Sequence, residues 1–272
     1  MDTLLFLLPP FVASLSILAI LGYLGIHVLE REIIFIDIAL AQIAAVGTTA
    51  AVVFLHLPDH SGLSMAIAFG FTLIAAAFFS AVDRRITEIT HEAVIGVAYA
   101  IAAAGALFIM AMHSGGDVHM ENMLTGSILW AQWPDILFCL SIFIAVGLFH
   151  WRYRHKFITL SENYHDKQME GRPSAWWDFF FYATMGLVIT ISVKIAGVLV
   201  IFAFLIIPAT ISAMLASSWK KRLLYGWSFG AVATLLGLWF SYRFDFTCGT
   251  SIVSFLGLAL IGVGVTQRLK KS

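Results

Sequence analysis

Long apolar runs separated by short polar segments repeat along the whole chain. A membrane core of about 30 Å needs about 20 mostly apolar residues per helix. The runs that meet this requirement are residues 10–28, 33–55, 62–82, 92–112, 134–150, 176–193, 195–216, 223–241 and 251–267. They are continuously apolar rather than alternating, which favours helices over the strands of a membrane barrel. The pattern predicts an all-α, polytopic membrane helical bundle with nine transmembrane helices.

One predicted outer segment, residues 113–133, has a character of its own. It begins with a polar turn that contains glycine and continues into a short apolar piece, 123–131, which is too short to span a bilayer. We expect this piece to lie at the interface or to re-enter the membrane, with Trp130 and Trp133 at headgroup depth.

The longest polar stretch between apolar runs is residues 151–175. It is too short to fold alone, so the sequence predicts one membrane domain over residues 1–272 and no soluble domain. Within this stretch we expect a short helix that ends near Gly171 and Pro173. Contact with a cytoplasmic partner is the natural use of residues 152–175, and a merely solvated loop is the alternative.

Composition excludes several classes of protein. Hydrophobic residues make up 60% of the chain, charged residues 12%, and the mean hydropathy is +0.92, values that exclude a soluble domain. The formal net charge of zero provides no basic surface for nucleic acid. Cys139 and Cys248 form no metal-binding motif. The N-terminus lacks a basic segment, so we interpret the first run as a retained span.

The distribution of Lys and Arg predicts the orientation. If Met1 lies outside the cell, every Lys and Arg except Lys194 and Arg243 falls in an inner segment. The positive-inside rule therefore predicts a multi-pass protein of the cell membrane, with its N-terminus outside and its C-terminus in the cytoplasm.

Imidazole and carboxylate side chains gather in two predicted outer segments. They are His113, Asp117, His119 and Glu121 in one segment, and His56, Asp59 and His60 in the other. Such ligands suit a borderline divalent ion such as zinc, although an ordinary polar loop has a similar composition.

A second set of polar residues lies inside a predicted span. Asp37 and Gln42 interrupt the apolar run 33–55, and a carboxylate in such a run is expensive and by default functional. Five residues advance a helix by about 500°, so the two side chains do not share a face and one helix cannot chelate an ion with both. Asp37 also lies near the inner end of the run, where it could instead reach water or pair with Arg31.

Charged residues of both signs mark the predicted inner face. They are Arg84, Arg85, Glu88, His91 and Glu92, together with Glu162, Asp166, Lys167 and Glu170. Mixed charge suits a docking surface for a soluble subunit, and also an ordinary solvated loop. The chain has no GxSxG, HExxH or Walker A motif, so we expect no enzyme activity of its own.

Four ordered stretches resemble the integral membrane permease of metal-ion ABC importers, the zinc, manganese and iron class. They are DIALAQIAAVG at 37–47, HEAVIGVAYA at 91–100, SVKIAGVLVIFAFLIIPATISAML at 192–215 and SYRFDFTCGTSIV at 241–253. The third stretch is the closest match, and its Pro208, in mid-span, is expected to kink the helix.

The resemblance implies several partners. They are a cytoplasmic ABC ATPase, an extracytoplasmic metal-binding protein and a second permease copy in the surrounding lipid. It implies that residues 161–172 form the coupling helix, with Gly171 at the family's glycine and Lys167 where the family has alanine.

One part of the family pattern is missing. Aligned on Gly47, the family's metal-gating aspartate falls on Ile38, its histidine falls on Gln42, and Asp37 takes a glycine position. An aspartate and a histidine one helical turn apart can hold an ion together, whereas Ile38 and Gln42 cannot.

The sequence thus predicts a permease subunit that moves a divalent metal, with zinc preferred over manganese or iron, and that binds no covalent cofactor. Asp37 and Gln42 would line part of the path, and the outer loop of His, Asp and Glu residues would meet the binding protein or receive the ion. A permease for a chelated metal or cofactor is one alternative, motivated by the missing pair. An ATP-independent secondary carrier is the other, disfavoured because we find no internal repeat.

Overall fold

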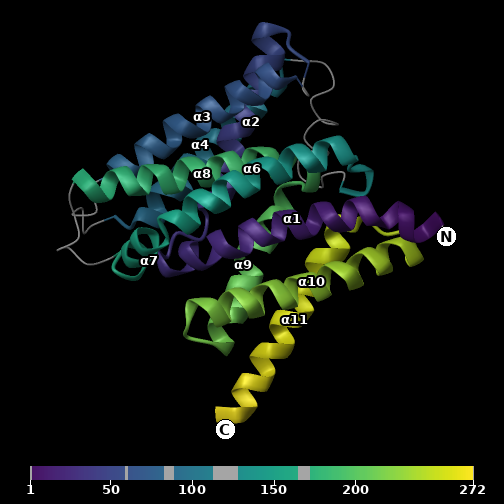
Figure 1. Ribbon diagram of the computed structural model, residues 1–272. Coiled ribbons are helices and arrows are strands. Elements are labelled where there is room, and N and C mark those ends of the chain that lie inside the picture. Colours follow the sequence, from purple (N-terminus) through teal and green to yellow (C-terminus); the bar gives the residue numbers. More distant parts are fainter. Residues whose placement is uncertain (1, 59–60, 83–88, 113–127, 165–171, 272) are drawn as a thin grey trace. The chain divides into compact units, whose positions relative to one another are not determined.

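The computed structural model describes residues 2–58, 61–82, 89–112, 128–164 and 172–271, and within these ranges all regular structure is helical (Figure 1). The helices are α1 (Asp2–Glu30), α2 (Ile36–Leu55), α3 (Gly62–Ala81), α4 (His91–Met110), the 3-10 helix η1 (Ile128–Trp130), α6 (Trp133–Arg152), α7 (Arg154–Glu162), α8 (Arg172–Ala196), α9 (Val198–Leu215), α10 (Trp219–Phe244) and α11 (Cys248–Lys271).

Among the described residues, nine helices are long and apolar enough to cross a membrane. Each matches one predicted apolar run, so the all-α, nine-span prediction is confirmed. Several helices extend beyond the predicted runs, because polar residues at membrane-water boundaries continue a helix after the apolar run has ended. α10, for example, begins at Trp219 and includes Lys220 and Lys221, whereas the predicted run begins at residue 223.

Several hydroxyl side chains inside the spans bond to carbonyls of their own helices. Thr49 donates to the carbonyl of Ala45 and Thr190 to that of Gly186, each at 2.7 Å. Because lipid supplies no hydrogen-bond partners, this local bonding lets Ser and Thr lie in a span at low cost.

The chain forms two compact units. The first comprises Met1–Leu29, Asn122–Gly147 and Ser192–Ser272, and in it α9, α10 and α11 pack against one another. α1 approaches α9 so closely that a Cβ atom built on Gly25 would lie 1.9 Å from the carbonyl oxygen of Leu205. Only glycine fits this contact, as expected where helix backbones meet in a membrane.

The second unit comprises Glu30–Glu121 and Leu148–Ile191. In it α2 packs against both α3 and α4. A Cβ atom on Gly47 would lie 2.8 Å from the Cα atom of Ala68, so α2 and α3 are also in backbone contact. This packing brings the first turn of α2 next to the first turn of α4.

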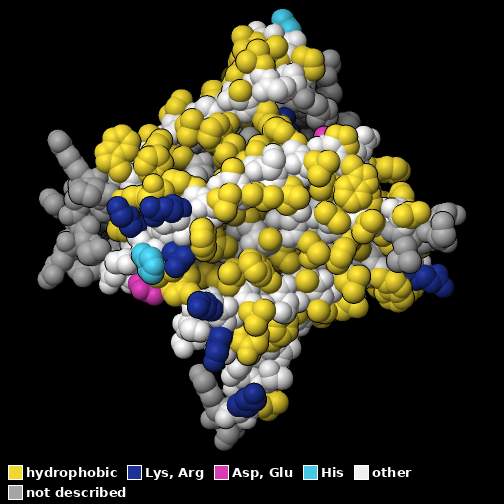
Figure 2. All heavy atoms as spheres, in the orientation of Figure 1, with side chains coloured by type: hydrophobic (Ala, Val, Ile, Leu, Met, Phe, Trp, Pro, Cys, Tyr) yellow, Lys and Arg dark blue, Asp and Glu magenta, His cyan; other side chains and the backbone are white. Residues whose placement is uncertain are grey.

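Large apolar side chains cover much of the surface. Ile74 is 70% exposed and Phe108 is 69% exposed, and Figure 2 shows hydrophobic side chains over most of the visible face. Such faces suit contact with lipid. In the predicted interfacial piece, η1 buries Ile128 and exposes Trp130, while residues 113–127 lie outside the described ranges.

Candidate functional site

Asp37 lies in the first turn of α2 and is buried, with 2% of its surface exposed. Its Oδ1 atom has no hydrogen-bond partner among the described residues. The alternative that Asp37 reaches water or pairs with Arg31 is wrong, because Asp37 is buried and Arg31 pairs with Asp178 instead. Gln42, further along α2, is partly buried.

Glu92, at the start of α4, is a neighbour of Asp37 that the sequence did not reveal. Its Oε1 atom accepts a hydrogen bond of 3.1 Å from the backbone N–H of Phe35, the residue before α2. Its Oε2 atom is buried and has no partner in the part of the chain that the structure describes. Two carboxylates therefore lie at the N-terminal end of α2, where the helix dipole favours negative charge.

The outer metal-binding residues stay a prediction. His56 caps the C-terminal end of α2 and is exposed, whereas His60, His113, Asp117 and His119 lie outside the described residues, as do Asp59 and Glu121. Among the residues that the structure describes, no group of three or more His, Cys, Asp or Glu side chains could hold a metal ion.

The predicted coupling segment is described only at its two ends. Glu162 is the exposed last residue of α7, and Asp166, Lys167, Glu170 and Gly171 fall outside the described ranges. The predicted helix end near Gly171 lies outside the described residues and stays a prediction; α7 itself ends at Glu162. Pro173 lies in the first turn of α8, where a missing backbone N–H costs nothing.

Pro208 lies buried inside α9, which continues as a helix on both sides of it. The predicted kink stays a prediction.

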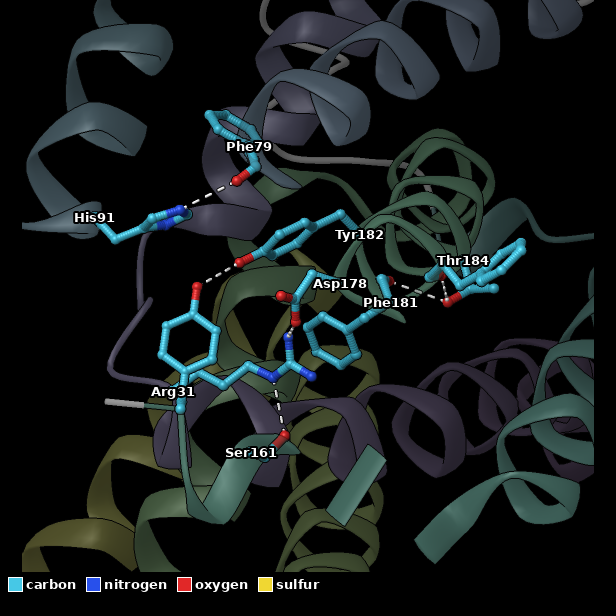
Figure 3. A network of polar contacts seen from close by, with 10 residues as sticks. Arg31, Phe79, His91, Ser161, Asp178, Phe181, Tyr182 and Thr184 are labelled. Atoms are coloured by element: carbon cyan, nitrogen blue, oxygen red, sulfur yellow. Dashed lines mark hydrogen bonds and ion pairs between the residues drawn. The ribbon is translucent and has the colours of Figure 1, made fainter. Parts of the chain in front are cut away.

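A buried polar cluster within the second unit joins α7 to α8 and to the start of α4 (Figure 3). We call it the Arg31 cluster; its members are Arg31, His91, Ser161, Tyr164, Asp178, Phe181 and Tyr182. Arg31 follows α1 and is fully buried. Its Nη1 atom donates to Oδ1 of Asp178 in α8 at 2.8 Å, and its Nε atom donates to Oγ of Ser161 in α7 at 2.9 Å.

Aromatic rings enclose this ion pair. The guanidinium carbon of Arg31 lies 4.0 Å from the ring centre of Phe181 and 5.3 Å from that of Tyr164. The hydroxyl groups of Tyr164 and Tyr182 are 2.8 Å apart. Cation–π contacts of this kind stabilise a guanidinium that has left water.

The cluster extends to the start of α4. His91 stacks on Tyr182 with an angle of 13° between the rings, and its Nε2 atom donates to the carbonyl of Phe79 in α3 at 3.1 Å. Because Glu92 follows His91 in the chain, the cluster and the Asp37–Glu92 carboxylates are joined at the first residues of α4.

Sequence reasoning missed the Arg31–Asp178 pair. One signal was present: Asp178 is the only acidic residue between 171 and 196, within the run 176–193, so it needed a partner. The two residues are 147 positions apart in the sequence, and this separation gives no hint of which cation the partner is.

Nine apolar helices among the described residues and a largely hydrophobic surface define the class as a multi-pass helical membrane protein. Residues 3–266 match the model of the ABC 3 transport family, and the chain therefore belongs to that family. The resemblance carried by the sequence motifs is thus confirmed.

Two relatives of named function match most of the chain. The manganese transport system membrane protein MntC of Listeria monocytogenes is 23% identical over 91% of this chain and 86% of its own length. A probable metal transport system membrane protein of Treponema pallidum is 26% identical over 94% of both chains.

A solved structure has the same fold. PsaBC from Streptococcus pneumoniae in complex with Fab matches with a TM-score of 0.78 and 21% identity, covering 95% of this chain and 90% of that chain.

Proposed function

We propose that this chain is the membrane-spanning permease of an ABC importer that moves a divalent transition-metal ion into the cell. The observation that carries the proposal is the family match over residues 3–266, which covers nearly the whole sequence. The relatives named for manganese and metal transport support the substrate class.

The proposal requires partners for energy and delivery. A cytoplasmic ATPase hydrolyses ATP, an extracytoplasmic binding protein delivers the ion, and a second permease copy completes the path. Residues 161–172, which begin in the last turn of α7, dock on the ATPase. The distribution of Lys and Arg supports an outer N-terminus and an inner C-terminus.

We propose that Asp37 lines the path of the ion, and it has more support than any other residue. It combines burial, an oxygen atom without a partner and a second carboxylate at Glu92. Carboxylate oxygens suit manganese, whereas zinc prefers imidazole and thiolate ligands in addition. Manganese is therefore the first ion to test, and zinc and iron are the comparisons.

The test is metal-stimulated ATP hydrolysis by the permease reconstituted with its ATPase and binding protein. We expect stimulation by Mn²⁺, Zn²⁺ or Fe²⁺ that depends on the binding protein. No stimulation by any of the three would sink the proposal.

A metal chelate is a second candidate substrate, favoured by one observation. Ile38 and Gln42 stand where the family resemblance expects an aspartate and a histidine, so α2 lacks a ligand pair for a bare ion. Stimulation by a chelated metal and none by free ions would support this candidate.

A further inference from the structure

We propose that the Arg31 cluster positions α7 and connects the ATPase-docking segment to the carboxylates at the start of α2. This inference rests on the proposed function, because it assigns a coupling role within an ABC importer. It names Arg31 and Tyr164 as positioning residues, which act on transport without touching the transported ion.

The Arg31 cluster holds the C-terminal end of α7. Ser161 lies in the last turn of α7 and Tyr164 follows two residues after the helix ends, so both belong to the described start of the docking segment, residues 161–172. Phe157 and Leu160 bury the apolar face of α7, so the helix is held by both packing and polar contacts. A displacement of the docking segment therefore acts on Ser161 and Tyr164 first.

Separating the ion pair of Arg31 and Asp178 would cost free energy. Arg31 and Asp178 are both buried, and parting them would leave two charges without compensation in a low-dielectric interior. α7 cannot move away from α8 while Arg31 bonds to both Ser161 and Asp178. The pair therefore makes α7 and the inner end of α8 move as one body.

A chain of contacts connects the Arg31 cluster to α2. Tyr164 contacts Tyr182 through their hydroxyl groups, and both rings contact His91, the first residue of α4. The next residue, Glu92, binds the backbone N–H of Phe35 directly before α2. A shift of α7 is thereby passed through α4 to the helix turn that carries Asp37.

The experiment uses the complete importer in proteoliposomes, with Arg31→Lys and Tyr164→Phe as test variants. Lysine keeps the charge but cannot bind Asp178 and Ser161 together through a rigid fork. Phenylalanine keeps the ring against Arg31 and removes only the hydroxyl that faces Tyr182. Arg152→Lys, at an exposed arginine of α6, is the matched control.

Two quantities are measured: Mn²⁺ transported per ATP hydrolysed, and amide hydrogen exchange of α7. We expect the transport ratio to fall about tenfold for Arg31→Lys and about threefold for Tyr164→Phe, in line with typical coupling energies. We also expect faster exchange over Arg154–Glu162 with no change in α9. The control should match the wild type in both quantities.

Each possible result supports or overturns either the inference or the proposed function. Purified variants that melt earlier but keep the wild-type transport ratio would show a purely structural role and overturn the inference, as would unchanged exchange in α7. If Arg31→Lys does not fold, the ratio for Tyr164→Phe decides alone. If the wild-type importer shows no stimulation by Mn²⁺, Zn²⁺ or Fe²⁺, the proposed function fails, and the exchange measurement still tests whether the cluster anchors α7.

Discussion

Asp37 and Asp178 are the same residue type in opposite circumstances. Both are buried in apolar helices, but Asp178 is paired with Arg31 whereas Oδ1 of Asp37 has no partner among the described residues. A buried carboxylate with a partner serves the structure, and one without a partner weakens it. Neutralising each should therefore have opposite consequences.

Asp178→Asn should lower the free energy of unfolding by about 3 kcal/mol, because it leaves Arg31 buried without its counter-charge. Asp37→Asn should leave that free energy unchanged or raise it. Thermal melting followed by tryptophan fluorescence in detergent measures both. Equal destabilisation by the two variants would contradict the distinction.

Asp37→Asn should nevertheless lower Mn²⁺ transport at least about tenfold, as loss of a metal ligand does. Gln42→Ala, on another face of α2, should have a smaller effect. Transport is measured with matched amounts of folded protein, and a wild-type rate for Asp37→Asn would remove Asp37 from the path.

The double substitution Ile38→Asp and Gln42→His would restore an acid–imidazole pair one turn apart. If the substrate is a bare ion, we expect the pair to tighten apparent affinity for Zn²⁺ by about tenfold or more, since imidazole suits zinc. If the substrate is a chelate, free Zn²⁺ should still not stimulate ATP hydrolysis. Each single substitution serves as the control.

At the scale of elements, glycine decides which helices touch. Gly25→Ala should cost about 3 kcal/mol or prevent assembly, because its Cβ would overlap the Leu205 carbonyl between α1 and α9. Gly257→Ala in α11 meets open space and should be neutral or slightly stabilising. The yield of folded protein and its melting temperature measure the contrast, which would be refuted by similar values for both variants.

The sequence predicted the helices better than it predicted the contacts between them. Hydropathy found each of the spans in the described part of the chain, because burial in lipid needs an unbroken apolar run, whatever the run packs against. It could not show that Glu92 binds the start of α2, because that contact depends on how α2 packs against α4. Nor could it show that Pro173 begins a membrane helix, because proline suits the first turn of one helix as well as the end of another.

At the scale of the whole molecule, the predicted orientation can be tested by labelling. Cysteines introduced at Asp245 and at Lys270, both exposed, should react with an impermeant maleimide from outside and from inside respectively. Cys139 and Cys248 are buried and should react slowly. Labelling of both introduced positions from the same side of intact cells would disprove the predicted alternation.

Helix length carries a consequence for the membrane in which this protein works. α2, α3, α4 and α6 have 20 residues each, and each is therefore about 30 Å long, just enough to cross an average bilayer. α10 has 26 residues and can tilt to adapt, but the shorter helices have no length to spare. A thicker membrane would pull Glu92 and Asp37, at the ends of α4 and α2, into hydrocarbon, so bilayer thickness itself should tune this transporter.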